Sequence, residues 1–174
     1  MDQQHRTLDI PDPALVVLVG PSGSGKSAFA ARHFAPTQVL SSDRFRAMVA
    51  DDEDDQSASA DAFELLHLAA GKRLAAGRRT VIDATNVREG ARRELLRLAR
   101  EYDLPAVAIV LDLPVGLCME RNEQRPERVV GAGVIRRHRA NLHESLDSLA
   151  DEGFHAVHVL RRQSEVDSVV LAFH

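Results

Sequence analysis

The stretch GPSGSGKS, residues 20–27, decides the fold of this chain. It matches the phosphate-binding pattern G-x-x-x-x-G-K-[ST] in full. A continuous apolar run of buried-strand length, residues 14–19, precedes it, and residues 26–33 carry a helical pattern that ends before Pro36. A glycine-rich turn between a strand and a helix directs backbone amides and the helix N-terminus toward a phosphate. The stretch therefore predicts a site for nucleotide phosphates.

The residues of this loop divide into those that offer side chains and those that offer backbone amides. Lys26 is expected to reach the β- and γ-phosphate oxygens, and Ser27 is expected to ligate Mg²⁺. The strand before the loop and the helix after it argue against a glycine-rich turn that matches by chance. The residues predicted to contact the donor phosphates are Gly20, Ser22, Gly23, Ser24, Gly25, Lys26 and Ser27.

Strand and helix patterns alternate along the rest of the chain. Further strands are predicted at residues 38–40, 80–83, 106–111 and 156–160, and helices over about residues 44–49, 60–76, 87–102, 114–122, 134–150 and 165–173. This alternation predicts an α/β fold with a five-stranded parallel sheet that helices cover on both faces. Ligands of such sheets bind at the carboxyl ends of the strands, where the motifs of this chain fall.

The composition limits the kinds of protein that this chain can be. A chain of 174 residues with 44% hydrophobic content is expected to form one domain, here residues 14–174 after a short leader at residues 1–13. Cys118 is the single cysteine, and no apolar run approaches the roughly 20 residues of a membrane span. We therefore expect a cytoplasmic protein with no membrane partner. The net charge of -4 means that any contact with nucleic acid must be local.

A carboxylate ends the predicted strand at residues 80–83. Asp83 lies where proteins with this loop commonly hold Mg²⁺, directly or through water, although a simple strand-end cap would look the same. Ala84 follows it instead of the glutamate that motor ATPases use to polarise water, so hydrolysis-driven machinery is disfavoured. The chain also lacks the asparagine-lysine-x-aspartate segment with which GTPases recognise guanine.

Asp43 is the best candidate for the acceptor side of a phosphoryl transfer. Transfer to an alcohol benefits from a carboxylate that accepts the hydroxyl proton as the new bond forms. Asp43 could equally be the N-cap of the helix that starts near Arg44, and the spacing does not separate the two roles. Arg46 follows three residues later, about one turn along the same helix face, where it could hold a phosphate of the acceptor.

Arginines recur near the predicted helix at residues 114–122. Arg121, Arg125 and Arg128 are spaced by four and three residues, so a helical segment would project them to one side as a cationic lid over the transferring phosphoryl group. A solvated arginine face is the alternative. Three further arginines, Arg136, Arg137 and Arg139, are assigned no catalytic role. The acidic run at residues 51–55 is interpreted as a solvated loop, with a place near the acceptor as its alternative.

Several of these segments together resemble a known family. They are SSD at residues 41–43, DDE at 51–53, DATNV at 83–87 and ERN at 120–122, and they are similar to the kinase domain of bacterial polynucleotide kinase-phosphatase over roughly residues 14–172. The resemblance implies an adenylate-kinase-like three-layer fold that transfers the γ-phosphate of ATP, or of another NTP, to the 5′-hydroxyl end of RNA or DNA.

The same resemblance implies a role for each matching residue. Lys26 and Ser27 would bind the phosphates and Mg²⁺, Asp43 would be the general base, and Arg46 would contact the phosphate of the acceptor. The clamp and lid positions fall on Arg121, Arg125 and Arg128. Bacterial members continue into a metallophosphatase and a nucleotidyltransferase, so phosphatase and ligase domains, or separate proteins of an end-repair pathway, are expected as partners.

Two other functions fit the sequence. A small-molecule or nucleotide-sugar kinase of similar fold, such as a gluconate kinase, an antibiotic phosphotransferase or a zeta-type toxin, would use the same loop. A non-catalytic nucleotide-binding module would bind ATP without transferring phosphate. Labelling of an acceptor separates the three functions, because each predicts a different labelled product or none.

Overall fold

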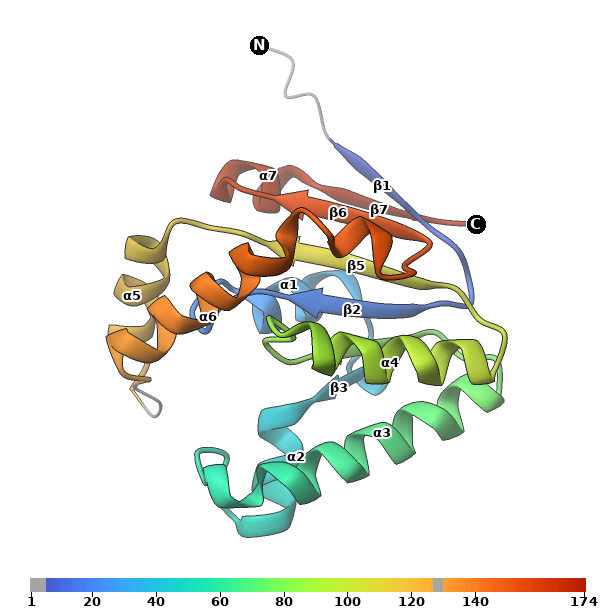
Figure 1. Cartoon of the computed structure of the whole chain (residues 1–174), viewed down its shortest axis with the longest axis horizontal. Coiled ribbons are helices and arrows are strands. Elements are labelled where there is room, and N and C mark those ends of the chain that lie inside the picture. Colours follow the sequence, from blue (N-terminus) through green and yellow to red (C-terminus); the bar gives the residue numbers. More distant parts are fainter. Residues whose placement is uncertain (1–5, 127–129) are drawn as a thin grey trace.

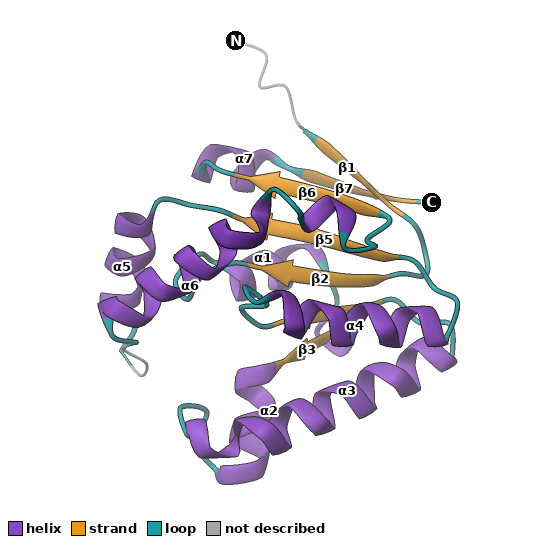
Figure 2. Ribbon diagram, viewed as in Figure 1, coloured by secondary structure: helices purple, strands orange, loops and turns teal. Residues whose placement is uncertain are grey.

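A five-stranded parallel sheet lies at the centre of the structure (Figures 1 and 2). The computed structural model describes residues 6–126 and 130–174. All neighbouring strands of this sheet pair in parallel, as the alternating pattern predicted. In order across the sheet, the strands are β3 (Val39–Ser41), β4 (Thr80–Asp83), β2 (Leu15–Val19), β5 (Ala106–Leu111) and β6 (Ala156–Leu160).

Helices cover both faces of the sheet, which confirms the predicted three-layer α/β architecture (Figure 2). β2 is buried along its whole length because each of its faces packs against a separate core. Val16 and Leu18 belong to one core, and Val17 and Val19 belong to the other. This burial on both faces explains why the strand appears in the sequence as an unbroken apolar run rather than as an alternating one.

Each core has its own set of helices. One contains side chains of α1 (Lys26–His33), α5 (Val115–Glu123) and α7 (Gln163–Ser168). The other contains side chains of α3 (Ser59–Ala75) and α4 (Glu89–Glu101), and α6 (Ala132–Leu146) contributes to both. The remaining elements are α2 (Ser42–Ala50) and the short helices η1 (Pro36–Gln38), η2 (Gln56–Ala58) and η3 (Leu149–Asp151).

Two segments differ from the sequence-based expectation. Residues 7–10, expected to lie in a leader, form β1 (Thr7–Ile10), and residues 170–173, expected to end a helix, form β7 (Val170–Phe173). The two strands pair in parallel as a separate sheet. Leu8 and Ile10 are buried on its inner face. Sequence patterns missed this pair because each strand is short and its partner lies at the opposite end of the chain.

Arg92 on α4 is completely buried and connects several elements. It donates hydrogen bonds to both carboxylate oxygens of Glu152 at 2.8 and 2.5 Å, to Ser145 Oγ at 2.7 Å and to the carbonyl oxygen of Asn86 at 2.9 Å. These bonds tie α4 to α6, to the residue after η3 and to the loop after β4. Burying an ion pair costs desolvation free energy. That cost is offset here because each nitrogen of the Arg92 guanidinium donates a hydrogen bond.

Arg92→Ala is expected to lower the free energy of unfolding by about 3–5 kcal/mol, because the Glu152 carboxylate would remain buried without its partner. Urea denaturation measures this loss. Arg93→Ala is the matched control, since the pair of Arg93 with Glu89 at 2.6 Å is exposed on the same helix and should cost much less. Equal losses in the two variants would contradict a structural role for the buried pair.

Candidate active site

The phosphate-binding loop has the backbone that its glycines permit. Gly23 and Gly25 have φ angles of 81° and 92°, in the left-handed region that side chains disfavour, and Gly25 is the N-cap of α1. A Cβ atom built on Gly23 would lie 2.2 Å from the carbonyl oxygen of Cys118. This contact brings α5 directly against the loop. Any larger residue at position 23 would therefore disturb both the loop and the helix that carries Arg121.

Lys26 lies at the floor of the loop and is almost fully buried. Its Nζ donates hydrogen bonds to the carbonyl oxygens of Gly20 and Pro21, both at 2.9 Å. Burial lowers the pKa of Lys26 to about 8, and the nearby carboxylates of Asp83 and Asp43 partly oppose that shift. The ammonium group therefore interacts with both Asp83, the predicted Mg²⁺ ligand, and Asp43, the candidate base on the acceptor side.

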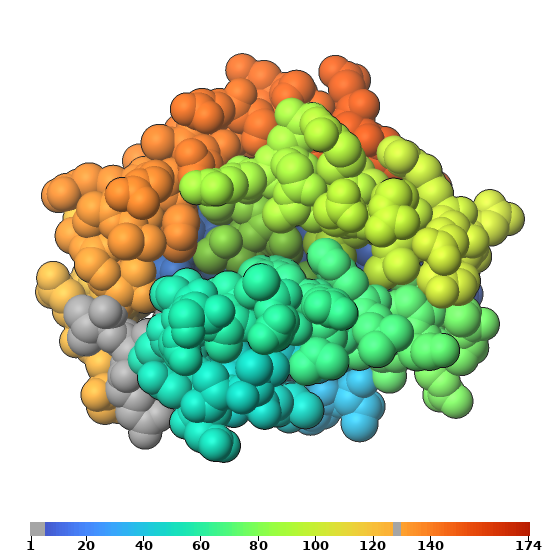
Figure 3. Space-filling model, turned by 60° about the horizontal axis from the view of Figure 1, so that its bottom comes forward, coloured from blue at the N-terminus to red at the C-terminus, as the bar shows by residue number. Residues whose placement is uncertain are grey.

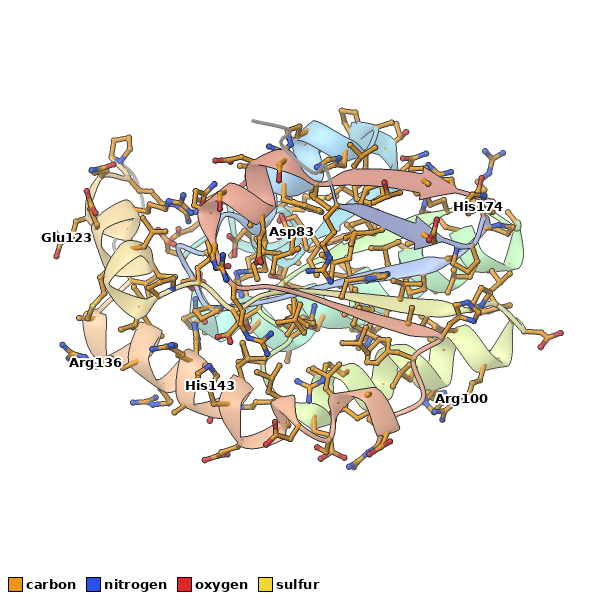
Figure 4. All side chains as sticks on the ribbon, turned by 90° about the horizontal axis from the view of Figure 1, so that it is seen from above. Asp83, Arg100, Glu123, Arg136, His143 and His174 are labelled. Carbon is orange, nitrogen blue, oxygen red and sulfur yellow. The ribbon has the colours of Figure 1, made fainter. Side chains whose placement is uncertain are left out.

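Ser27, at the start of α1, and Asp83, at the end of β4, lie in contact. Ser27 Oγ donates a hydrogen bond to Asp83 Oδ2 at 2.7 Å. Burial raises the pKa of Asp83, and the hydrogen bond from Ser27 and the charge of Lys26 oppose that shift. Figure 4 shows Asp83 in the interior of the domain.

This pair of oxygens fits Mg²⁺. A buried carboxylate with a raised pKa is stabilised by a cation, and hydroxyl and carboxylate oxygens are the hard donors that Mg²⁺ prefers. Mg²⁺ usually keeps several waters and takes only one or two protein oxygens beside the substrate phosphates. Among residues 6–126 and 130–174, no three His, Cys, Asp or Glu side chains gather as a possible metal site. Ser27 and Asp83 would hold the ion together with the phosphates.

Asp43 lies in the first turn of α2 and not at its N-cap. Ser41 occupies the cap, where its Oγ accepts a hydrogen bond from the amide of Arg44 at 3.5 Å. The capping role considered for Asp43 is therefore wrong. Arg46 Nη1 lies 2.5 Å from Asp43 Oδ1, and its Nε donates to Ser59 Oγ at 3.1 Å. Arg46 is buried, so these contacts fix its guanidinium beside the Asp43 carboxylate.

The structure places two of the three predicted lid arginines beside the loop. Arg121 on α5 donates hydrogen bonds to the carbonyl oxygen of Ser24 at 3.5 Å and to Gln163 Oε1. Arg125 follows α5 and lines a cavity that Lys26, Asp43 and Asp83 also line, and its charge contributes to the lowered pKa of Lys26. Arg128 lies outside the described residues.

The acidic run at residues 51–55 forms a turn held by its own side chains. Asp51 is the C-cap of α2, and Asp55 is the N-cap of η2 and accepts a hydrogen bond from the amide of Ser57 at 2.9 Å. Asp52 Oδ1 accepts from the amide of Asp54 at 2.9 Å. Asp54 also lines the cavity that contains Asp43. The run is thus a capped turn with one member at the edge of the site.

Lys26, Asp43, Asp83 and Arg125 all line one cavity of about 740 Å³, here called the central cleft. It lies between the phosphate-binding loop, α2, α3 and α6, and Figure 3 shows the hollow between α6 in orange, α4 in yellow-green and the teal α2–α3 region. Sequence reasoning missed Arg88, Arg137 and His138, which also line it. The amide of Ser22 donates to His138 Nδ1 at 3.3 Å, so α6 contacts the loop directly. No local sequence signal marks these three residues, because only the fold brings their elements together.

A second cavity of about 440 Å³, here called the donor-side cavity, lies on the α1, α5 and α7 side of the loop. Its residues come from the loop, from α1 and α5, and from α7 at the far end of the chain. Arg121 and Gln163 both line it, and the Arg121 guanidinium donates a hydrogen bond to Gln163 Oε1. Val166 and Asp167 contribute further lining from α7. The loop glycines are therefore accessible from two sides.

Comparison with known proteins agrees with this architecture. Residues 15–149 match the family AAA_33, described as an AAA domain. The chain belongs to this family. The AAA_33 domain has a P-loop kinase-like fold, with the five-stranded parallel sheet and the phosphate-binding loop described above. A search of curated protein sequences gives no match.

Solved structures that resemble this AAA_33 domain come from proteins of several kinds. A chain in the Pnkp1/Rnl/Hen1 RNA repair complex has a TM-score of 0.69 and 24% identity, over 80% of this chain and 47% of that chain. A gluconokinase from Sinorhizobium meliloti 1021 has a TM-score of 0.55 and 17% identity, over 91% and 87%. The PezAT toxin-antitoxin system of Streptococcus pneumoniae gives 0.59 and 15%, over 93% and 73%. At these identities the likeness establishes the fold of the domain.

Proposed function

We propose that this chain is a polynucleotide 5′-hydroxyl kinase, which transfers the γ-phosphate of ATP, or of another NTP, to the 5′-OH end of RNA or DNA. The observation that carries the proposal is the pair of the half-buried Asp43 carboxylate and the buried Arg46 guanidinium, which lie in the same cleft as Lys26. A carboxylate able to accept a proton lies beside a guanidinium able to hold a phosphate. An acceptor that bears both a hydroxyl and a phosphate diester matches this pair.

The donor nucleotide is proposed to occupy both sides of the loop. Its phosphates would receive hydrogen bonds from the loop amides and from Lys26, and its nucleoside would occupy the donor-side cavity between Arg121 and α7. Mg²⁺, held by Ser27 and Asp83, would neutralise charge on the donor phosphates. Arg125 lines both cavities, so its guanidinium can face the phosphoryl group that moves between donor and acceptor.

Asp43 is proposed as the general base. As the oxygen of the 5′-hydroxyl forms its bond to the γ-phosphorus, the bond from that phosphorus to the β-γ bridging oxygen breaks. The hydroxyl proton passes to the Asp43 carboxylate, and the nucleoside diphosphate leaves with the negative charge. Lys26 and Arg125 stabilise the charge that builds on the transferring oxygens. Arg46 holds the acceptor phosphate so that the hydroxyl meets Asp43.

The cellular setting belongs to the same proposal. The structure has no helix in its described part that is long and apolar enough to cross a membrane. We propose a cytoplasmic enzyme of nucleic-acid repair that works with phosphatase and ligase activities, either as further domains or as separate proteins. The likeness to a chain of an RNA repair complex supports this setting, although this chain spans 47% of that chain.

A small-molecule kinase is the second candidate. The chain covers 87% of the gluconokinase from Sinorhizobium meliloti, a larger share than the 47% of the chain in the RNA repair complex. A polyhydroxylated acceptor would also use Asp43 as base. It would not use the buried guanidinium of Arg46 as a phosphate contact unless the acceptor itself were phosphorylated.

The two candidates predict different labelled products. The protein is incubated with Mg²⁺ and γ-labelled ATP, and with a 5′-hydroxyl oligonucleotide, its 5′-phosphorylated counterpart, or gluconate. We expect label in the 5′-hydroxyl oligonucleotide and in neither of the other two. Saturable labelling of gluconate with none in the oligonucleotide would overturn the proposal in favour of the second candidate.

A further inference from the structure

A side branch leaves the central cleft between α3, α4 and α6. It has a volume of about 200 Å³ and includes Asn141 and Ala91, which do not line the central cleft. The two cavities adjoin, since six residues line both of them, namely Phe63, Thr85, Arg88, Val134, Arg137 and His138. The branch therefore lies beside the cleft that contains Asp43, where a ligand longer than one nucleotide would reach.

Two arginines of the branch lack a partner among the described residues. Arg88 is the N-cap residue of α4, Arg137 lies on α6, and neither side chain forms an ion pair or hydrogen bond in the described part of the chain. Other arginines of α4 are engaged, since Arg92 pairs with Glu152 and Arg93 with Glu89. Both residues are exposed, and their guanidinium groups can bind an anion such as a phosphate from the wall of one small cavity.

The charge along the cleft points to an anion with several phosphates. The net charge of the chain is -4, which repels polyphosphates in general. The central cleft nevertheless contains five cationic residues against three acidic ones. The cationic residues are Lys26, Arg46, Arg88, Arg125 and Arg137, and the acidic ones are Asp43, Asp54 and Asp83. Lys26 and Arg125 serve the donor, Arg46 serves the phosphate next to the reacting hydroxyl, and Arg88 and Arg137 remain for an anion farther along the acceptor.

Resting on the proposed function, we propose that the side branch binds the second nucleotide of the acceptor strand. Arg88 and Arg137 hold the 3′-phosphate of this second nucleotide, because planar guanidinium groups match the oxygens of a phosphate. The half-buried ring of Phe63 offers an apolar surface beside its base, and the Asn141 amide offers a donor and an acceptor. The site therefore selects a strand of at least two nucleotides over a single nucleotide.

The test compares acceptors of increasing length. We measure kcat/KM for a nucleoside 3′-phosphate and for the corresponding di- and trinucleotides, each with a 5′-hydroxyl and a 3′-phosphate. The wild-type protein should prefer the dinucleotide and the trinucleotide over the nucleoside 3′-phosphate by about tenfold or more, as expected for a charge-assisted phosphate contact. Arg88→Ala and Arg137→Ala should each remove most of this preference, and Arg137→Lys should restore part of it.

Arg136→Ala is the matched control, because Arg136 also lies on α6 but points to the outside of the domain (Figure 4). It should keep the full preference for the trinucleotide. Labelling of every 5′-hydroxyl acceptor with equal efficiency would overturn this inference and leave the proposed function standing. An unchanged preference in both Arg88→Ala and Arg137→Ala would also overturn it. Absence of label in all three acceptors would overturn the proposed function itself.

Discussion

Lys26→Ala is expected to reduce phosphoryl transfer by at least about 10²–10³-fold, because the ammonium group is a preorganised donor to the oxygens that gain charge in the transition state. The structure supports a large effect, since Lys26 is buried in the loop and no other lysine is near. Lys72, the other lysine of the chain, is exposed on α3. Lys72→Ala is therefore the control and should retain wild-type activity. Comparable losses in the two variants would contradict a role for Lys26 at the phosphates.

The lowered pKa of Lys26 adds a second measurement on the same residue. Below its pKa of about 8, Lys26 is charged before the nucleotide arrives. Above that pH it is neutral in the free protein, and phosphate binding, which favours the charged form, must take up a proton. Affinity for ATP should therefore fall as the pH rises through about 8. Lys26→Ala should show no such fall, and calorimetric titration at pH values on both sides of 8 measures it.

Asp43→Asn is expected to lower kcat by on the order of a hundredfold or more, because it removes the proton acceptor while keeping the size of the side chain. The KM for ATP should change little, since the donor phosphates are proposed to contact the loop and not α2. Asp51→Asn is the matched control. Asp51 is an exposed residue at the other end of α2 with a φ of 56°, a conformation that asparagine also adopts readily. A parallel loss of ATP affinity in Asp43→Asn would show a structural or metal-linked role for Asp43.

The sequence predicted the sheet well because burial on both faces leaves a local signal. The strands at residues 80–83, 106–111 and 156–160 have the predicted bounds. The strand predicted at 14–19 begins one residue later, and the strand predicted at 38–40 shifts by one residue at both ends. β1 and β7 were missed because their pairing joins the two ends of the chain. The buried role of Arg92 was missed for a similar reason. Within an arginine-rich helix, no local pattern separates it from exposed Arg93.

In the candidate site too, residues within local motifs were predicted, and residues that only the fold brings to the site were missed. Lys26, Ser27, Asp43 and Asp83 follow from motifs at the carboxyl ends of neighbouring parallel strands, where the topology of the sheet brings them together. Arg88, Arg137 and Gln163 were missed because they reach the site from α4, α6 and α7. Their convergence depends on how those helices pack. The sequence could therefore predict the residues at the phosphate-binding loop, but not the residues from α4, α6 and α7 that line the surrounding cavities.

The measurement that tests the central claim most directly is single-turnover transfer of label from γ-labelled ATP to a 5′-hydroxyl oligonucleotide, with wild-type protein and with Asp43→Asn. Digestion of the product to nucleotides then identifies the labelled atom. We predict that the wild-type protein places the label on the 5′ oxygen of the terminal nucleotide, and that Asp43→Asn binds ATP but transfers the label at least about a hundredfold more slowly. Label at any other position, or undiminished transfer by Asp43→Asn, would contradict this account.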